Sequence, residues 1–236
     1  MNKSALNARL LSAAEFVRQD ATFADIGTDH AYLPLFLLDA GRIKHAFCCD
    51  INEGPLASAR RNAEDRGRLR DCEFVLTDGA SVLAGRGITD YAICGMGGEL
   101  IADIIARAPH LCDPSLNLIL QPMSRQEKLR EYLYSAGFEI KRESYSFDAG
   151  KYYVCMQVSY VGKAREISPV ESVAGPSSAE FCGSECRLAY LGNKLTSLER
   201  AYRGKSEVGE ATESEAELIS QLREYIKKYN SERKEI

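Results

Sequence analysis

The fold is decided by a short stretch that reads Thr22-Phe23-Ala24-Asp25-Ile26-Gly27-Thr28-Asp29-His30. The run from residue 22 to residue 27 has the length and apolar character of a buried strand, and it ends at a glycine. A helix is expected next, over residues 32–40, with Pro34 tolerated in its first turn. A strand that turns through glycine into a helix is the opening unit of an α/β sheet.

The same alternation continues along the chain. A helix is expected before the stretch, at residues 5–18. After it come strands at 45–50, 72–79, 90–95 and 117–122 and helices at 55–66, 99–107 and 125–136. Two long strands, 138–147 and 152–161, follow around a turn at residues 148–150. This pattern predicts a Rossmann-like, doubly wound α/β sheet that is mostly parallel and ends in an antiparallel edge hairpin.

The composition changes after about residue 165. Two linker-like stretches follow, Ser168-Pro169 and Gly175-Pro176-Ser177-Ser178. Apolar residues at helical spacing then predict helices over 179–203 and 210–233, separated by a turn at 203–206, as an antiparallel, coiled-coil-like hairpin. The sequence therefore predicts one domain at residues 1–165 and a C-terminal α-helical hairpin at 166–236, with the hairpin not needed for the sheet.

Composition excludes several classes of protein. The 236 residues are 45% hydrophobic and 27% charged, which is typical of a globular chain and not of a disordered or fibrous one. The apolar runs are too short to span a membrane, and no secretory signal opens the chain. The eight cysteines include no Cys-x-x-Cys pair, so we expect free thiols, a cytoplasmic location and no metal site.

The net charge of −4 does not show the overall basic surface that is typical of nucleic-acid-binding proteins. Basic residues do cluster locally, at residues 60–70, 125–130 and 141–142. These clusters can be explained either as solvated helix faces or as a surface that contacts a polyanion. The C-terminal hairpin is acidic, with 13 acidic and 10 basic residues.

Four motifs end the first four predicted strands. Asp25 and Gly27 end the first, Asp50 the second and Asp78-Gly79 the third, while the fourth runs into Gly95-Met96-Gly97-Gly98. In a doubly wound sheet these carboxyl ends meet at the edge where ligands bind. A carboxylate at the end of the second strand is suited to ribose hydroxyls, and one after the third to an adenine amino group.

The charge of these motifs discriminates between two cofactors. A dinucleotide needs glycines that admit a pyrophosphate, but residues 29 and 32 are Asp and Tyr, and the carboxylates of Asp25 and Asp29 would repel a diphosphate. S-adenosylmethionine (SAM) instead presents an ammonium and a sulfonium group, both cationic. The motifs therefore favour a SAM-dependent methyltransferase.

The chain resembles the bacterial tRNA (adenine-22-N1)-methyltransferases over roughly residues 5–160. The resemblance lies in five stretches and in the N-terminal Leu6-x-x-Arg9-Leu10 pattern. The stretches are Asp25-Ile-Gly27-Thr-Asp29-His30-Ala-Tyr32-Leu-Pro34, Cys49-Asp50-Ile51-Asn52, Thr77-Asp78-Gly79, Cys94-Gly95-Met96-Gly97-Gly98 and Leu120-Gln121-Pro122. It implies SAM as cofactor, tRNA as substrate and a helical C-terminal hairpin. The Asn/Asp-Pro-Pro-aromatic loop of many amino-methylating enzymes is absent after the fourth strand.

The resemblance also implies roles for individual residues. Asp29 would be catalytic. The cofactor would be bound by Asp25, Gly27, His30, Asp50, Ile51, Asp78, Gly79 and Met96. The substrate would be bound by Arg9, Gly95, Gly97, Gly98, Gln121 and Pro122. On this hypothesis the enzyme methylates N1 of an adenine in tRNA, at position 22, and is a monomer or a weak dimer without a metal.

Other interpretations remain open from the sequence. The chain could methylate a small molecule or could be a SAM-binding module without catalysis. Asp29 could instead be the N-cap of the helix that follows it. The hairpin could bind tRNA phosphates or serve protein contacts; the basic residues expected to contact phosphate are Arg187, Lys194, Arg200, Arg203 and Lys205.

Overall fold

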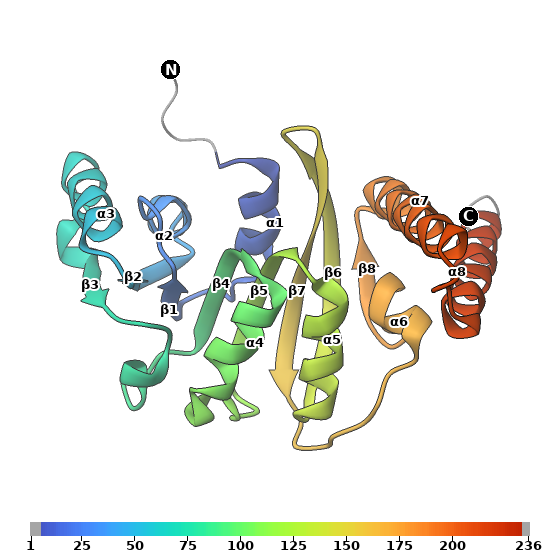
Figure 1. The fold of residues 1–236 in the computed structure, drawn as a ribbon. Coiled ribbons are helices and arrows are strands. Elements are labelled where there is room, and N and C mark those ends of the chain that lie inside the picture. The colour runs from blue at the N-terminus through green and yellow to red at the C-terminus, as the bar shows by residue number, and fades with distance from the viewer. Residues whose placement is uncertain (1–5, 233–236) are drawn as a thin grey trace.

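The computed structural model describes residues 6–232, and Figure 1 shows its arrangement. The strands are β1 (Ala21–Ile26), β2 (Ile43–Asp50), β3 (Cys72–Leu76), β4 (Asp90–Gly97), β5 (Asn117–Ser124), β6 (Phe138–Asp148), β7 (Lys151–Tyr160) and β8 (Glu180–Cys182). The α-helices are α1 (Ala8–Phe16), α2 (Tyr32–Asp39), α3 (Glu53–Asp65), α4 (Gly98–Ala106), α5 (Gln126–Ser135), α6 (Pro169–Ala174), α7 (Ser184–Glu207) and α8 (Glu213–Glu232). Three short 3-10 turns are η1 (Leu69–Asp71), η2 (Ser81–Leu83) and η3 (Pro109–Leu111).

All eight strands form one sheet in the order β3-β2-β1-β4-β5-β7-β6-β8. The first five strands of this order are parallel, and the hairpin of β6 and β7 adds antiparallel pairing. The order reverses between β1 and β4, which is where an open α/β sheet binds its ligand. The predicted α/β class and edge hairpin are therefore confirmed.

Both faces of the sheet are covered by helices. Leu118 and Leu120 of β5 pack in one apolar cluster with the helices α4 to α8, whereas Ile119 packs in a second cluster with α1, α2 and α3. Because successive side chains of a strand point to opposite faces, a strand buried on both sides must be apolar throughout. This burial explains the continuous apolar runs that mark the strands in the sequence.

The stretch predicted to be a linker is folded onto the sheet. Ser168 begins α6 with a capping box: its hydroxyl accepts from the Glu171 N–H at 3.3 Å, and the Glu171 carboxylate accepts from the Ser168 N–H at 3.3 Å. β8 then pairs in parallel with β6, beside α6 and α7 in Figure 1. The predicted helix over 179–203 is thus wrong at its start, because residues 180–182 pair with the open edge of β6.

The turn of the helical hairpin is also displaced from the predicted position. α7 continues through Gly204 to Glu207, and Gly209, with a φ of +75°, lies in the turn before α8. A Cβ atom at Gly204 would meet nothing within 4 Å, so this glycine is an ordinary position in an exposed helix. The predicted end of the last helix, at Arg233, lies outside the described residues.

A buried ion pair between α5 and β6 also contacts the C-terminal segment. Arg130 of α5 and Glu143 of β6 are both fully buried, and the guanidinium donates to the carboxylate at 2.7 and 3.2 Å. Arg130 also donates to the carbonyls of Ser172 and Val173 in α6, at 2.7 and 3.1 Å. The Tyr145 hydroxyl donates to the same carboxylate at 2.5 Å. The segment after residue 165 therefore packs on the sheet through α6, a contact that the sequence did not predict.

Arg187 is unavailable to a phosphate. Its side chain is fully buried, lies 3.4 Å from the centre of the Phe181 ring, and donates to the Tyr225 hydroxyl at 2.6 Å and to the Ala174 carbonyl at 3.1 Å. The prediction that Arg187 contacts tRNA is wrong, because the stacked guanidinium packs β8 against α7 and α8.

The other predicted phosphate contacts divide into two groups. Lys194 donates to the Gln126 amide oxygen at 2.8 Å and lies 3.3 Å from the Glu127 carboxylate, and Lys205 pairs with Glu215. Arg200 and Arg203 are exposed on α7.

All eight cysteines are free thiols. Within residues 6–232, no helix combines the length and apolar character needed to cross a membrane.

Candidate active site

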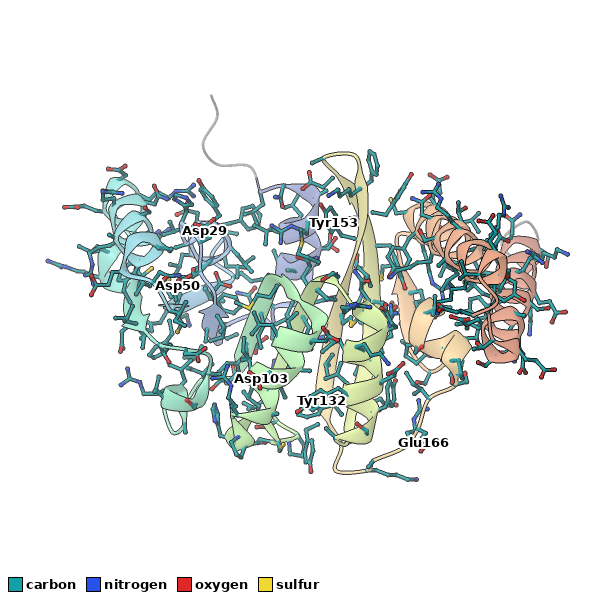
Figure 2. The ribbon with its side chains drawn as sticks, viewed as in Figure 1. Asp29, Asp50, Asp103, Tyr132, Tyr153 and Glu166 are labelled. Carbon is teal, nitrogen blue, oxygen red and sulfur yellow. The ribbon has the colours of Figure 1, made fainter. Side chains whose placement is uncertain are left out.

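A cavity of about 630 Å³ opens at the carboxyl edge of the sheet. Its walls come from the ends of β1, β2, β3 and β4 and from α1, α2 and α4. They comprise Asn7, Arg9, Leu10, Asp25, Ile26, Gly27, Asp29, Tyr32, Leu33, Asp50, Ile51, Asn52, Thr77, Asp78, Gly79, Cys94, Gly95, Met96, Leu100 and Ile104. Figure 2 shows Asp29 and Asp50 close together at this end of the molecule, away from α7 and α8. The volume is that of an ordinary small-molecule site, for which about 300–1,000 Å³ is typical.

The turn after β1 is shaped by Gly27. Its φ is +79°, and its N–H donates to the Cys49 carbonyl at 2.8 Å, which ties the turn to β2. A Cβ atom here would lie 2.2 Å from Cε of Met96, so any larger residue would displace that side chain. Glycine therefore lets the backbone turn and leaves Met96 room in the wall of the cavity.

Asp25 is the most deeply buried carboxylate of the cavity, with 6% of its surface exposed. Burial, together with the nearby charge of Asp50, raises its pKa to about 6, whereas Thr28 and Arg9 oppose the shift. A buried carboxylate of this kind is stabilised by a cation that enters the site. Asp25 can therefore hold an ammonium group.

Asp50 ends β2 with its side chain partly exposed to the cavity. Oδ1 accepts from the Asn52 N–H at 2.8 Å, which fixes the carboxylate and leaves Oδ2 open for hydroxyl groups. Ile51, beside it, is 61% exposed and offers apolar surface to a flat ring. These two residues together can bind a nucleoside.

Asp78 lies after β3 and is held by a cation that the sequence did not suggest. Arg107, at the end of α4, donates to both carboxylate oxygens at 2.9 and 3.3 Å and also to Asp103 at 2.9 Å. A carboxylate offers about four lone-pair sites, so the paired group can still accept from an amino group. Arg107 is thus a positioning residue, and only the tertiary contact between α4 and the β3 loop reveals it.

Asp29 points its carboxylate outward at the mouth of the cavity, where its side chain is 75% exposed. Its carboxylate lies 3.3 Å from Nε2 of His30. The N-cap position of α2 is Ala31, whose φ is +53°, and the helix has no side-chain cap. The alternative that Asp29 caps this helix is therefore wrong, and the carboxylate is available to a ligand.

His30 does not line the cavity. Its ring stacks on Tyr32, with centres 5.2 Å apart, and its carbonyl accepts from the Asn62 side chain at 3.0 Å. His30 has a φ of +58°, in the left-handed region, just before α2 begins. It contacts two residues of the cavity wall, Asp29 and Tyr32, without lining the cavity itself.

Gln121 supports the cavity from behind. The residue is fully buried on β5, and its amide oxygen accepts from Nη1 of Arg9 at 2.6 Å and from the Gly95 N–H at 3.2 Å. Its amide nitrogen donates to the Pro122 carbonyl at 3.2 Å. Arg9, from α1, does line the cavity, so Gln121 positions a lining residue without touching a ligand.

The remaining predicted residues form the base of the site. A Cβ atom at Gly98 would lie 2.3 Å from the Arg125 carbonyl, so the glycine permits close packing of α4 against the β5–α5 connection. Gly97 is the N-cap of α4, and Pro122 is buried in β5. None of these three residues lines the cavity.

The structure therefore brings ten of the predicted residues together around one cavity: Arg9, Asp25, Gly27, Asp29, Asp50, Ile51, Asp78, Gly79, Gly95 and Met96. Five predicted residues lie behind or beside it: His30, Gly97, Gly98, Gln121 and Pro122. Sequence reasoning assigned no role to the other ten lining residues: Asn7, Leu10, Ile26, Tyr32, Leu33, Asn52, Thr77, Cys94, Leu100 and Ile104. Seven of them lie inside the quoted motifs, which was the available signal: Leu10, Ile26, Tyr32, Leu33, Asn52, Thr77 and Cys94.

The lining fits SAM in charge and shape. Among the described residues that line the cavity, four are aspartates and Arg9 alone is cationic. SAM carries two cationic groups and one carboxylate, so its charge is complementary to this set. The described residues contain no cluster of three or more acidic, histidine or cysteine side chains that could hold a metal.

Comparisons with known proteins agree with this geometry. A family model described as a methyltransferase domain matches residues 6–156. The tRNA (adenine(22)-N(1))-methyltransferase of Bacillus subtilis (strain 168) is 28% identical over 215 residues, which cover 91% of this chain and 90% of that protein.

Two solved structures share the whole fold. A candidate tRNA (m1A22) methyltransferase from Streptococcus pneumoniae, in complex with S-adenosyl-L-methionine, is 30% identical with a TM-score of 0.76, covering 91% of this chain and 97% of that chain. M. capricolum TrmK, in complex with S-adenosyl-homocysteine, is 25% identical with a TM-score of 0.75, covering 94% and 98%. The chain therefore belongs to the methyltransferase domain family, in which it groups with the bacterial tRNA (adenine(22)-N(1))-methyltransferases.

Proposed function

We propose that this protein transfers the methyl group of SAM to N1 of an adenine in tRNA, at position 22. One observation carries the proposal: three aspartates end β1, β2 and the β3 turn around a single cavity, and a fourth, Asp29, stands at its mouth. The set suits a cationic nucleoside cofactor, and a relative that covers 91% of this chain is a tRNA (adenine(22)-N(1))-methyltransferase.

We assign the cofactor to the inner part of the cavity. Asp50 accepts from the ribose hydroxyls, Ile51 packs against the purine, and Asp78, oriented by Arg107, accepts from the adenine amino group. Asp25 faces the ammonium group, and Gly27 and Met96 shape the space beside it. When bound, SAM supplies an electrophilic methyl group on sulfur.

We assign Asp29 to the chemical step. The N1 lone pair of the target adenine attacks the methyl carbon as the carbon–sulfur bond breaks, so no base is needed and the adenine ring gains a positive charge. The Asp29 carboxylate accepts from the N6 amino group and stabilises that charge as it develops. Gly95 leaves room for the flat base, and holding N1 in line with the methyl group supplies further acceleration.

We assign tRNA contact outside the cavity to the C-terminal segment 166–236, the second domain expected from the sequence. Arg200 and Arg203 remain exposed on α7 and can meet phosphates, which position a nucleic acid without reading its sequence. Because the proposed substrate is tRNA, we expect the enzyme in the cytoplasm. The alternative is that the acidic hairpin makes protein contacts. The tRNA affinity of the Arg200→Gln/Arg203→Gln double variant distinguishes the two roles: it falls if the hairpin binds tRNA, and it is unchanged if the hairpin serves protein contacts.

The test is methylation of unmodified tRNA transcribed in vitro. The protein is incubated with SAM and the tRNA, and the digested nucleosides are analysed by mass spectrometry. We expect 1-methyladenosine from tRNA with adenine at position 22 and none from a matched transcript with guanine there. A protein that binds SAM but produces no methylated adenosine would contradict the proposal, and would favour a small-molecule substrate or a non-catalytic role.

A further inference from the structure

An aromatic pair stands at the tip of the β6–β7 hairpin, outside the cavity. Phe147 and Tyr152 lie opposite each other on the two strands, with ring centres 4.8 Å apart, and 50% of Phe147 is exposed. The two residues of the turn, Ala149 and Gly150, both have a positive φ, of +46° and +79°. Such a turn matches the twist of the flanking strands, so it fixes the tip that carries the two rings.

The topology of the sheet places this tip at the same edge as the cavity. β7 is antiparallel to β5 and β6 is antiparallel to β7, so β6 ends at the carboxyl edge of the parallel strands. Leu120 of β5 pairs with Met156 of β7, and the next residue, Gln121, pairs with Cys94 of the cavity wall. Tyr152 therefore lies about 10 Å beyond the level of Cys94, at about 3.3 Å per residue. Figure 1 shows the hairpin extending beyond the other strands.

The end of β5 connects the cavity to the aromatic pair. The sheet order β4-β5-β7-β6 places it between them, and Met123, Ser124 and Arg125 are all exposed there. Arg125 precedes α5, and Tyr152 packs in the apolar cluster that α5 joins, so both lie on the same face of the sheet. Among residues 6–232, the Arg125 side chain has neither a hydrogen bond nor an ion pair. This guanidinium is therefore available to an anion.

The chemistry of the proposed reaction indicates what this surface meets. N1 lies on the edge of adenine that pairs with another base, so the methyl group can reach it only after the adenine has left its pair and its stack. The nucleotides on either side then lose a stacking partner. Aromatic side chains stack on bases of any sequence, and an arginine beside them can hold a phosphate. Exposed rings next to a free guanidinium thus suit an unstacked RNA strand.

We propose that Phe147 and Tyr152 form a stacking platform for the nucleotides of tRNA next to the target adenine, and that Arg125 contacts their phosphates. This inference rests on the proposed function and adds a tRNA surface between the cavity and the C-terminal segment. Two residues before Phe147, the Tyr145 ring packs on Tyr190 of α7, with 5.2 Å between the ring centres. The platform therefore continues from the cavity edge to α7.

The first test measures the affinity of the full chain for unmodified tRNA. Phe147→Ala should raise the Kd for tRNA about 5- to 100-fold, as loss of one stacking ring does, and should change SAM affinity by less than about twofold. Phe147→Leu keeps apolar surface without a ring and should show most of this loss. Phe147→Trp keeps a ring and should show little of it.

The second test uses the salt dependence of tRNA binding. Arg125→Gln should reduce the slope of log Kd against log salt concentration by about one, as loss of one phosphate contact does. The matched controls follow β7, at the opposite edge of the sheet, where Val161 and Lys163 are also exposed. Val161→Ala and Lys163→Gln should leave both the affinity and the slope unchanged.

The other outcomes overturn the inference. An unchanged tRNA affinity in Phe147→Ala refutes the platform, and equal affinities of Phe147→Leu and Phe147→Trp show an apolar contact without stacking. A change in the elution volume of Phe147→Ala without tRNA, at unchanged tRNA affinity, shows that the surface joins two copies of the chain. SAM binding reports folding, and if Phe147→Ala does not fold, Phe147→Leu and Arg125→Gln decide. Failure of the unsubstituted protein to methylate tRNA would instead refute the proposed function.

Discussion

The buried pair of Arg130 on α5 and Glu143 on β6 offers the sharpest test of what holds α5 against the sheet. We expect Glu143→Gln to destabilise the protein strongly, because it leaves the Arg130 guanidinium buried without a counter-ion. Both side chains are fully buried, and the carboxylate accepts at 2.7 and 3.2 Å from Arg130 and at 2.5 Å from Tyr145. Breaking a buried pair from one side costs about 3–5 kcal/mol.

That cost is large beside the total stability of a domain, which is about 5–15 kcal/mol. The assay is urea denaturation, in which the free energy of unfolding is extrapolated to water and the m-values are compared. The matched control is Glu199→Gln, which breaks the exposed pair with Arg223, 2.6 Å apart, and should cost about 0–1 kcal/mol.

A double variant separates the charge from the packing. Arg130→Met with Glu143→Leu removes both charges, and leaves the Ser172 and Val173 carbonyls without their donor and the Tyr145 hydroxyl without its acceptor. We therefore expect it to be more stable than Glu143→Gln alone. A loss below about 1 kcal/mol for Glu143→Gln would refute the reasoning, because the buried guanidinium would then not need its partner.

The remaining predictions concern the cavity. Asp50→Ala should weaken SAM binding about 10- to 100-fold, since a charged acceptor for ribose hydroxyls is lost, at about 1.5–3 kcal/mol; calorimetry with an unchanged affinity would remove Asp50 from the site. Asp29→Ala should leave SAM affinity near that of the unsubstituted protein but lower kcat about 100-fold or more, measured as methyl transfer to tRNA; normal turnover would exclude a catalytic role. Burial raises the pKa of Asp25 to about 6, whereas the pKa of an aspartate in the unfolded chain is about 3.9. Between these two values the folded protein binds a proton that the unfolded chain does not bind. The free energy of unfolding of the ligand-free protein should therefore fall as the pH rises from about 4 to 6, by up to ~3 kcal/mol. SAM affinity should rise over the same range, since its ammonium group needs the ionised form; Asp25→Asn should flatten both profiles, and an unchanged pH dependence in that variant would show that another group titrates.

The sequence was sufficient to predict the order of the helices and strands and the main acidic residues of the cavity. Strands buried on both faces must be apolar throughout, so β1 and β4 were visible as runs, and their ends located Asp25 and the Gly95 turn. Asp50 and Asp78 followed from the same rule, because parallel strands bring their carboxyl ends to one edge.

Residues whose role depends on distant partners could not be predicted in this way. Arg187 and Lys194 are cations in the sequence, and nothing local distinguishes a buried, stacked guanidinium from one that meets phosphate. Arg107 reaches Asp78 across 29 residues, and Arg9 reaches Gln121 across 112. Such contacts form only when the helices pack on the sheet.

The C-terminal segment shows the same division most clearly. Apolar spacing sufficed for two long helices, because amphipathic periodicity is local. The three residues of β8 carry no such signal, and they form a strand only because β6 presents an unpaired edge. The local sequence pattern thus determined the helices and strands and the acidic edge of the sheet. Tertiary packing decided which charged side chains face the ligand and which hold the fold together, because burial and pairing depend on residues far apart in the chain.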